Sequence, residues 1–231
     1  MENPDNRSSW YTDNDYWYRG YSSFYKQEHN AALVWYWLKK RFGAALSINA
    51  VAGLLGNMEV ESTCNPGKWE KPVDDPLKWY NGFGLVQWSS SNFNPYIKWA
   101  IGEESYTGSH DYLIAKAEQM QSTWDGNAPL EMQRIYYEAQ NGLEWMGNQN
   151  ATQSGLPATP AFSMMGFFTN TIYSAWQCAE AWLWYYERPA DPPVGYRGDL
   201  AQNYWLPYLQ SLPPWRGGLP IYMMLRRHGI Q

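Results

Sequence analysis

The chain has 231 residues, which is enough for one well-packed core. Hydrophobic residues make up 45% and charged residues 17%, a balance typical of globular proteins that excludes wholesale disorder. The net charge of -5 disfavours a nucleic-acid-binding protein, because such proteins need a basic surface to neutralise phosphates.

Residues 1–26 are rich in Asp, Asn, Ser, Tyr and Trp and show no helical period, so we expect an extended arm that contacts other proteins or, alternatively, is flexible. The first residues contain neither a basic region nor an apolar region of the secretory type, and no apolar run is long enough to span a membrane. We therefore expect a product made in the cytosol, without stable membrane insertion.

Helical periodicity begins after the arm. Residues 27–42 place apolar side chains at helical spacing and stop at Gly43, and Ser47 is a typical N-cap for a second helix that runs to Ser62. Residues 67–92 and 148–160 contain the Gly, Pro and Ser of loops, with short strands in the former. Further helices are predicted at residues 95–101, 110–124, 130–145, 162–168, 171–186 and 200–209.

These elements predict one domain at residues 27–212, followed by a tail at residues 213–231. The tail holds three arginines and a histidine after Pro213-Pro214, and it is too short to fold alone. We expect it to pack against a partner protein. The aromatic content of 18%, with 15 Trp and 19 Tyr, predicts both core residues and stacking surfaces for sugars, bases or proteins, and composition alone does not choose among these.

The second predicted helix ends on a carboxylate. At about 100° per residue, Glu61 continues the apolar stripe that contains Leu54 and Met58, whereas Glu59 falls about 140° from Leu54. Glu61 is therefore expected to be half buried and Glu59 to be solvated. Burial, together with the negative end of the helix dipole, raises the pKa of a carboxyl, which suits a general acid at neutral pH.

Two further motifs carry polar groups that suit a sugar-binding site. Gly82-Phe83-Gly84-Leu85-Val86-Gln87-Trp88 combines two glycines with an amide and an indole ring. Tyr185-Tyr186-Glu187-Arg188-Pro189 ends the predicted helix at residues 171–186 with a second carboxylate. From their residues alone, Trp88 fits a core position, Gln87 fits a buried amide that bonds the loop, and Glu187 fits a salt bridge with Arg188 or another arginine.

Taken in order, Gly-Asn-Met-x-x-Glu-Ser-x-x-Asn-Pro from Gly56, the Gly82–Trp88 motif and Tyr-Glu-Arg-Pro-Ala from Tyr186 resemble the phage tail lysozyme family. That family comprises peptidoglycan-cleaving domains at phage tail tips and is similar in fold to goose-type lysozymes and lytic transglycosylases. The resemblance covers about residues 29–210. It implies an α+β, mostly α-helical protein with a lysozyme-like fold, a small loop or β-hairpin lobe and a substrate cleft.

The resemblance also implies roles for individual residues. Glu61 takes the position of the catalytic acid, Glu187 that of a second carboxylate and Gln87 that of a group that binds substrate or orients water. Substrate-binding positions are implied at Ser62, Asn65, Phe83, Trp88 and Tyr186. Glu59 stands where the family often has glutamine.

No cofactor or metal is expected. The three histidines are scattered, and neither a zinc-ligand pair nor a Cys-His constellation is visible, which disfavours a peptidase. His29 and His110 are expected on helix surfaces. Cys64 and Cys178 form one bridge or remain free thiols; two cysteines do not make a disulfide framework.

The resemblance implies a phage virion-associated hydrolase that cleaves between N-acetylmuramic acid and N-acetylglucosamine during genome delivery. Its expected partners are peptidoglycan and other tail proteins, reached through the arm and the tail, and not nucleic acid. We expect synthesis in the host cytoplasm and a place in the virion, at the tail or tail tip. The alternative is a non-catalytic glycan-binding or structural tail protein with a vestigial lysozyme domain.

Overall fold

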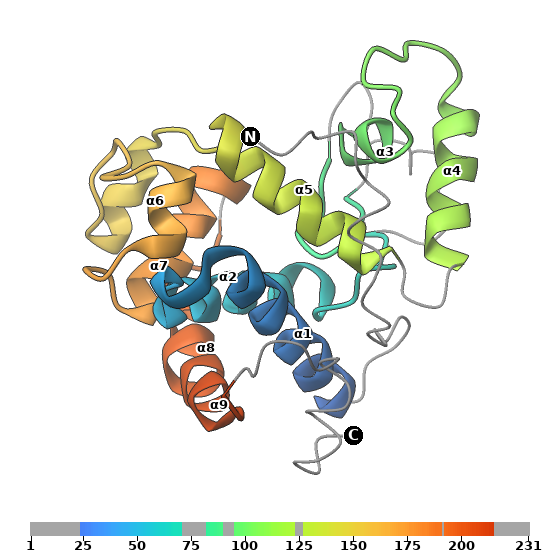
Figure 1. The fold of residues 1–231 in the computed structure, drawn as a ribbon. Helices are drawn as coiled ribbons and strands as arrows, with labels where there is room; N and C mark the ends of the chain where they lie inside the picture. The colour runs from blue at the N-terminus through green and yellow to red at the C-terminus, as the bar shows by residue number, and fades with distance from the viewer. Residues whose placement is uncertain (1–23, 71–81, 90–94, 123–126, 191, 215–231) are drawn as a thin grey trace.

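The computed structural model describes residues 24–70, 82–89, 95–122, 127–190 and 192–214. Most of the predicted arm at residues 1–26, and the predicted tail after Pro214, lie outside this part of the chain, so their partner contacts stay predictions. The described residues are mostly helical, as predicted, and helices are connected by loops and short 3₁₀ or π segments (Figure 1).

The elements follow one another along the chain. They are α1 (Phe24–Phe42), η2 (Gly43–Ala45), α2 (Ile48–Ser62), α3 (Pro95–Ala100), α4 (His110–Ser122), α5 (Ala128–Asn141), η4 (Gln149–Ser154), α6 (Met164–Thr169), α7 (Ala175–Trp182), η5 (Leu183–Glu187), α8 (Tyr196–Leu200), η6 (Ala201–Trp205) and α9 (Leu206–Ser211).

Helix α2 has the boundaries that its sequence predicts. The Ser47 side chain accepts a hydrogen bond from the backbone N–H of Ala50, as an N-cap does. The helix ends at Thr63, which adopts the left-handed conformation with φ 56° and donates its backbone N–H to the carbonyl of Glu59. Glu61 therefore lies in the last turn of the helix, where the sequence places it.

Helix α2 is the centre of the fold. Helices α1, α7, α8 and α9 and segment η6 pack around it, and its residues from Ala50 to Met58 are all buried. A Cβ atom at Gly56 would lie 2.6 Å from the carbonyl oxygen of Arg197, so the absence of a side chain there lets α8 lie close to α2. This close approach brings residues of α8, among them Arg197, next to α2.

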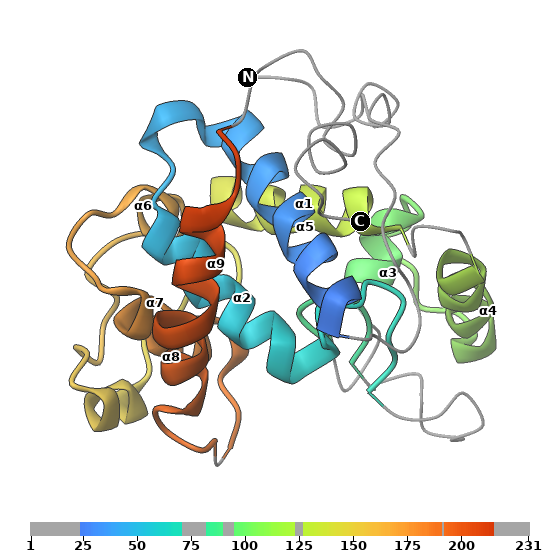
Figure 2. The same ribbon diagram turned by 90° about the horizontal axis from the view of Figure 1, so that it is seen from below.

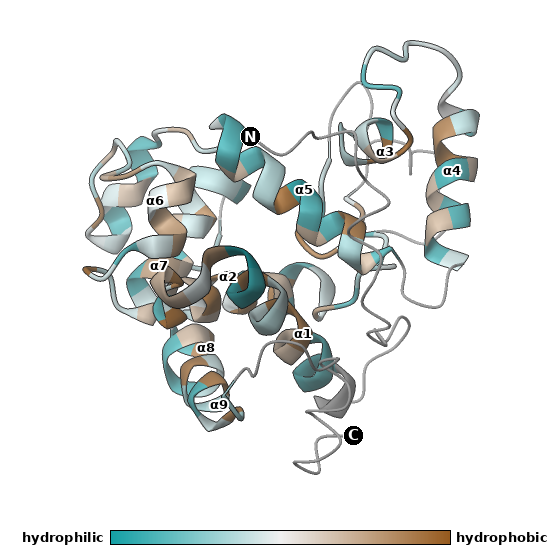
Figure 3. Cartoon of the chain, in the orientation of Figure 1, coloured by the Kyte–Doolittle hydropathy of each residue, from teal (hydrophilic) through white to brown (hydrophobic). Residues whose placement is uncertain are grey.

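Two groups of helices flank the centre. Helices α6, α7, α8 and α9 lie on one side and α3 and α4 on the other, with α1, α2 and α5 between them in both views (Figures 1 and 2). Hydrophobic residues are prominent on α2 and α7, whereas α4 and α5 carry both hydrophilic and hydrophobic residues (Figure 3). The core is continuous across these elements and contains the large side chains of Trp182, Trp184 and Trp205.

Several predicted boundaries change. Helix α5 ends at Asn141 rather than near residue 145, because Gly142 adopts φ 65° and terminates it. The predicted loop at residues 148–160 contains the 3₁₀ turn η4. The helix predicted from residue 171 begins at Ala175, since Ser174 and Gln177 form a capping box, and Ile172 is 80% exposed rather than buried.

The C-terminal half of the predicted 171–186 helix is wider than an α-helix. Segment η5 is π-helical, carries Tyr186 and Glu187, and ends where Arg188 adopts φ 50°. Single π turns inside helices occur frequently at functional sites, because they shift the direction of the side chains that follow. The last predicted helix is likewise divided, with the π-helical segment η6 between α8 and α9.

The predicted lobe at residues 67–92 is described only in part. In the described residues, Phe83 forms isolated antiparallel bridges with Trp69 and with Trp88, and no longer strand is present in this part of the chain. The β-hairpin lobe and the substrate cleft of the expected fold therefore stay predictions.

The structure also bears on the predictions for the cysteines, the histidines and membrane insertion. Cys64 and Cys178 are both free and both buried, so they form no bridge. His29 is 5% exposed, and the prediction of a surface histidine is wrong because α1 packs into the core with that face; the side chain of His110 lies outside the described part. None of the described helices is long and apolar enough to cross a membrane.

Candidate active site

Glu61 is half buried at the end of α2, with 22% of its side chain exposed. Its carboxylate forms an ion pair of 2.5 Å between Oε1 and the Nη2 atom of Arg197. The Nζ atom of Lys68 donates to the backbone carbonyl of Glu61 at 3.3 Å. The predicted half burial of Glu61 is thus observed.

Arg197 is a site residue that sequence reasoning missed. It lies on the short helix α8, it is 6% exposed, and its Nη1 atom donates to Oδ1 of Asn57 at 2.9 Å. Asn57 is one turn before Glu61 on α2, so one guanidinium bridges two successive turns of this helix. No motif contains Arg197, and only the packing of α8 on α2 reveals its role.

Glu187 belongs to the same electrostatic environment. The indole Nε1 of Trp182 donates to its Oε1 at 2.9 Å. Burial raises the pKa of Glu187 well above the ordinary value, the charge of Glu61 raises it further, and Arg197 and the Trp182 hydrogen bond lower it. The charges of the motif at the end of α2 and of the motif on η5 therefore act on each other.

The surroundings of Glu59 differ from those that the sequence predicts. The sequence places it on a solvated face, but its Oε2 accepts a hydrogen bond of 2.7 Å from Nε1 of Trp205, and burial raises its pKa while this hydrogen bond lowers it. The prediction of a solvated Glu59 is wrong because it assumes that only one face of α2 is covered. Segment η6 covers the other face.

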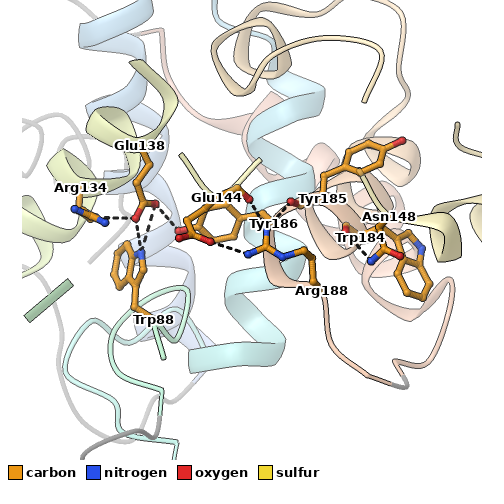
Figure 4. Close-up of polar contacts among 9 residues, drawn as sticks. All are labelled: Trp88, Arg134, Glu138, Glu144, Asn148, Trp184, Tyr185, Tyr186 and Arg188. Atoms are coloured by element: carbon orange, nitrogen blue, oxygen red, sulfur yellow. Dashed lines mark hydrogen bonds and ion pairs between the residues drawn. The ribbon is translucent and has the colours of Figure 1, made fainter. Parts of the chain in front are cut away.

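A buried carboxylate on α5 links the second and third motifs (Figure 4). Glu138 accepts hydrogen bonds from Nε1 of Trp88 at 3.1 Å and from the hydroxyl of Tyr186 at 2.6 Å. It also forms an ion pair of 2.6 Å with Arg134. Burial raises the pKa of Glu138, and Arg134 lowers it. Trp88 belongs to the glycine-rich loop, and Tyr186 lies next to Glu187 on η5. The bonds to Glu138 therefore fix this loop against the segment that carries the second carboxyl.

Arg188 contributes to the same wall but with a different partner from the one expected. Its Nη2 atom pairs with Oε2 of Glu144 at 2.7 Å, and its Nη1 atom donates to the carbonyl oxygens of Glu144 and Tyr185 (Figure 4). These bonds secure the end of η5. The alternative in which Arg188 neutralises Glu187 is not the arrangement that the structure shows.

Gln87 has the surroundings of a loop-organising amide. It adopts φ 51°, and its Nε2 donates to the carbonyl oxygens of Lys68 at 3.0 Å and Gly84 at 2.7 Å. Both N–H groups of the amide are thus used within the loop, which agrees with the alternative of a buried amide. A catalytic role for Gln87 stays a prediction.

A second buried acid supports the loop from α5. Oε2 of Glu131 accepts the backbone N–H of Leu85 at 2.6 Å. Gly84 has φ 88°, and a Cβ atom there would lie 2.7 Å from the same oxygen, so glycine is required both by the backbone conformation and by the approach of the carboxylate. Sequence reasoning assigned no role to Glu131, because nothing in the sequence distinguishes it from an ordinary glutamate in a helix.

The five predicted substrate-binding side chains are buried: Ser62, Asn65, Phe83, Trp88 and Tyr186. Ser62 donates to carbonyl oxygens of Met58 and Leu85 at 3.0 and 2.8 Å, and Oδ1 of Asn65 accepts from the N–H of Gly67. The ring of Trp88 stacks on Tyr96, with centroids 4.5 Å apart. These contacts shape the walls of the site, and direct contact with substrate stays a prediction for each of them.

Among the described residues, no group of three or more His, Cys, Asp or Glu side chains is arranged to hold a metal ion. The chemistry that the arrangement supports is proton transfer. It combines a partly exposed glutamate, a neighbouring carboxyl with a raised pKa and a buried cation, a pattern typical of acid–base sites. The mostly helical fold agrees with the lysozyme-like class that the motifs indicate.

The comparisons with known proteins agree with that class. The chain belongs to the phage tail lysozyme family, whose family model matches residues 29–209. It is similar to Morphogenesis protein 1 of Bacillus phage B103, with 33% identity over 157 residues. The match covers 68% of this chain but 33% of the relative, so the chain corresponds to about a third of that protein. Membership in this family supports a phage-associated, lysozyme-like protein of the virion.

Proposed function

We propose that this protein is a virion-associated peptidoglycan hydrolase. It cleaves the β-1,4 bond between N-acetylmuramic acid and N-acetylglucosamine and so aids cell-wall penetration during genome delivery. The observation that carries the proposal is the carboxyl pair: the charge of Glu61 contributes to the raised pKa of Glu187, and part of the Glu61 side chain is exposed. Membership in the phage tail lysozyme family supports the choice of glycan as substrate.

The pair performs the acid step as a unit. Two interacting carboxyls release their protons in steps that belong to the pair, and burial raises the pH at which the pair releases its last proton. Glu61 delivers it to the glycosidic oxygen, the bond between the sugar carbon and this oxygen breaks, and an oxocarbenium-like state forms. Water then attacks this carbon, or the hydroxyl at C6 of the muramic acid attacks it and gives an anhydro sugar, and the carboxylate pair takes up the proton that the attacking oxygen loses.

The buried side chains that hold the glycine-rich loop favour a groove for a glycan chain at the end of α2. Glu138 and Glu131 hold the glycine-rich loop at the end of α2 through Trp88 and Leu85. In this proposal the loop forms the smaller lobe of a substrate cleft, with Gln87 orienting substrate or water. The N-terminal arm and the C-terminal tail would attach the domain to other tail proteins.

The test is lysis of purified cell walls by Glu61→Gln, with Glu59→Gln as the matched control on the same helix. Loss of the general acid lowers the rate by about 10²–10⁴-fold. The control retains its bond to Trp205 through the amide oxygen and should keep activity near wild type. Unchanged lysis by Glu61→Gln would overturn the proposal.

Product identity gives an independent test. Mass spectrometry of muropeptides after digestion should show reducing-end muramic acid for hydrolysis or 1,6-anhydromuramic acid for transglycosylation. Cut peptide stems with intact glycan strands would contradict both. This experiment also distinguishes glycan cleavage from turbidity loss that has another cause.

A second candidate is a non-catalytic glycan-binding or structural tail protein. The observation in its favour is the ion pair between Glu61 and Arg197, since a carboxylate paired with a cation is a weak proton donor. The relative is named for morphogenesis rather than lysis. Binding of cell walls by wild type without any release of muropeptides would favour this candidate.

A further inference from the structure

The Arg197 side chain is buried and is held by two side chains of α2. Its guanidinium is almost fully buried, and it spans Oε1 of Glu61 at 2.5 Å and Oδ1 of Asn57 at 2.9 Å. Asn57 is itself fixed, because its Nδ2 donates to the carbonyl oxygens of Gly53 and Ala179 at 2.9 and 3.0 Å. The fork of the guanidinium therefore defines one orientation of the Glu61 carboxylate.

The segment that carries Arg197 is also held by a buried acid. Oε1 of Glu180, on α7, accepts the backbone N–H of Gly195 at 3.2 Å, immediately before α8. Its Oε2 accepts the hydroxyl of Ser154 at 2.5 Å, and this hydroxyl accepts Nε1 of Trp184 at 2.8 Å. A chain of hydrogen bonds thus runs from η4 through α7 to the start of α8.

The charges around Arg197 come from three elements. Glu61 lies on α2, Glu180 on α7 and Glu187 on η5, and Arg197 lowers the pKa of both Glu180 and Glu187 against the dominant effect of burial. Glu138 on α5 adds to the negative charge near Glu187. Lys68 reaches only the backbone carbonyl of Glu61. One cation therefore faces several acids, and in the described part of the chain Glu61 is the acid that forms a salt bridge with it.

We propose that Arg197 is a positioning residue for the carboxyl pair, which holds the Glu61 carboxylate in one orientation at the end of α2. This inference rests on the proposed function of the pair, and it adds the group that orients the acid. Proton transfer needs the carboxyl within hydrogen-bond reach of the glycosidic oxygen, so a fixed orientation favours the reaction.

Arg197 does not touch the glycosidic oxygen. It keeps the carboxylate at the end of α2 from rotating toward solvent. Removing the guanidinium should leave this carboxylate in several orientations, and not all of them point toward a bound glycan.

The experiment measures the orientation of Glu61 and the rate of cell-wall lysis for wild type, Arg197→Gln, Arg197→Met and Arg197→Lys. In crystal structures of the neutral variants, the Glu61 carboxylate should take more than one orientation. Their kcat for lysis should fall by about tenfold to a hundredfold, while their binding to cell walls stays near wild type. Arg197→Lys retains the charge but not the fork of the guanidinium, so it should recover part of this rate.

Folding and positioning effects are separated by two controls. Arg197→Met keeps an unbranched, apolar side chain in the buried site, where an apolar replacement of an ion pair is often tolerated. Arg41→Gln removes the same charge at the end of α1, where Arg41 lies over the ring of Trp37, and should leave the orientation of Glu61 unchanged. A single, wild-type orientation of Glu61 in folded Arg197→Met would overturn the inference.

Lysis by Glu61→Gln distinguishes this inference from the proposed function. If Glu61→Gln lyses cell walls as wild type does but the Glu61 carboxylate rotates in Arg197→Met, the proposed function fails and the role of Arg197 stands. If lysis depends on Glu61 but the orientation of Glu61 and the lysis rate of Arg197→Met match wild type, the inference alone fails.

Discussion

Glu187, at the end of η5, and Glu61, in the last turn of α2, act on each other through their charges. Burial raises the pKa of Glu187, and the charge of Glu61 raises it further. This relationship joins the ends of two elements that are distant in the chain, and it makes the protonation of one carboxyl depend on the other. It also makes both stability and activity depend on pH in a defined direction.

Folding stability should fall as the pH rises above the ordinary value of a glutamate, 4.5. The folded protein retains the Glu187 proton after the unfolded chain has lost it, so the unfolded state binds fewer protons and is favoured as pH increases. The decline ends once the pH exceeds the raised pKa. Chemical denaturation of wild type and Glu187→Gln between pH 4 and 8 measures the difference, which should grow in favour of the variant with pH. A constant difference across this range contradicts the raised pKa.

The same carboxyl should set the pH dependence of lysis. Glu187→Gln removes the carboxyl whose pKa is raised, so the activity of this variant should peak at lower pH than that of wild type. Initial rates of cell-wall lysis across pH provide the measurement. Glu144→Gln, which changes an acid paired with Arg188 rather than one of the pair, serves as the control. A uniform loss of rate at every pH would indicate a structural role for Glu187.

Glu138 should contribute more to stability than an exposed acid. Its replacement by Gln leaves the buried Arg134 without its counter-charge, at a cost of about 3 kcal/mol. Glu144→Gln breaks an ion pair whose side chains are 26% and 41% exposed, and should cost under about 1 kcal/mol. Urea unfolding compares the two variants. Equal losses would show that Trp88 and Tyr186 do not depend on the buried carboxylate.

Gly84 should be more sensitive to alanine than another glycine with positive φ. Both Gly84 and Gly142 adopt the left-handed region, where a side chain costs about 1–2 kcal/mol. At Gly142 a Cβ atom meets no heavy atom within 4 Å, whereas at Gly84 it lies 2.7 Å from the carboxylate of Glu131. Thermal unfolding should therefore show a larger loss for Gly84→Ala. Similar losses would mean that the loop moves away from Glu131 without penalty.

Local patterns in the sequence predict much of this protein, because they depend on neighbours in the chain. Ser47 predicts the start of α2, the apolar spacing predicts its length, and the position of Glu61 in the last turn follows from both. The three ordered motifs predict the family, which the match over residues 29–209 shows. Where local signals compete, as at Ser174, the stronger capping signal decides the boundary.

The sequence by itself determined the helices, the family and the position of Glu61, since periodicity, capping and motif order are encoded between nearby residues. Only the tertiary structure decided the surroundings of that acid. The packing of η6 on α2 left Glu59 half buried against Trp205, and the close approach of α8 at Gly56 brought Arg197 to Glu61. Contacts between distant segments depend on how whole faces pack, and helical periodicity does not specify which side chains meet there.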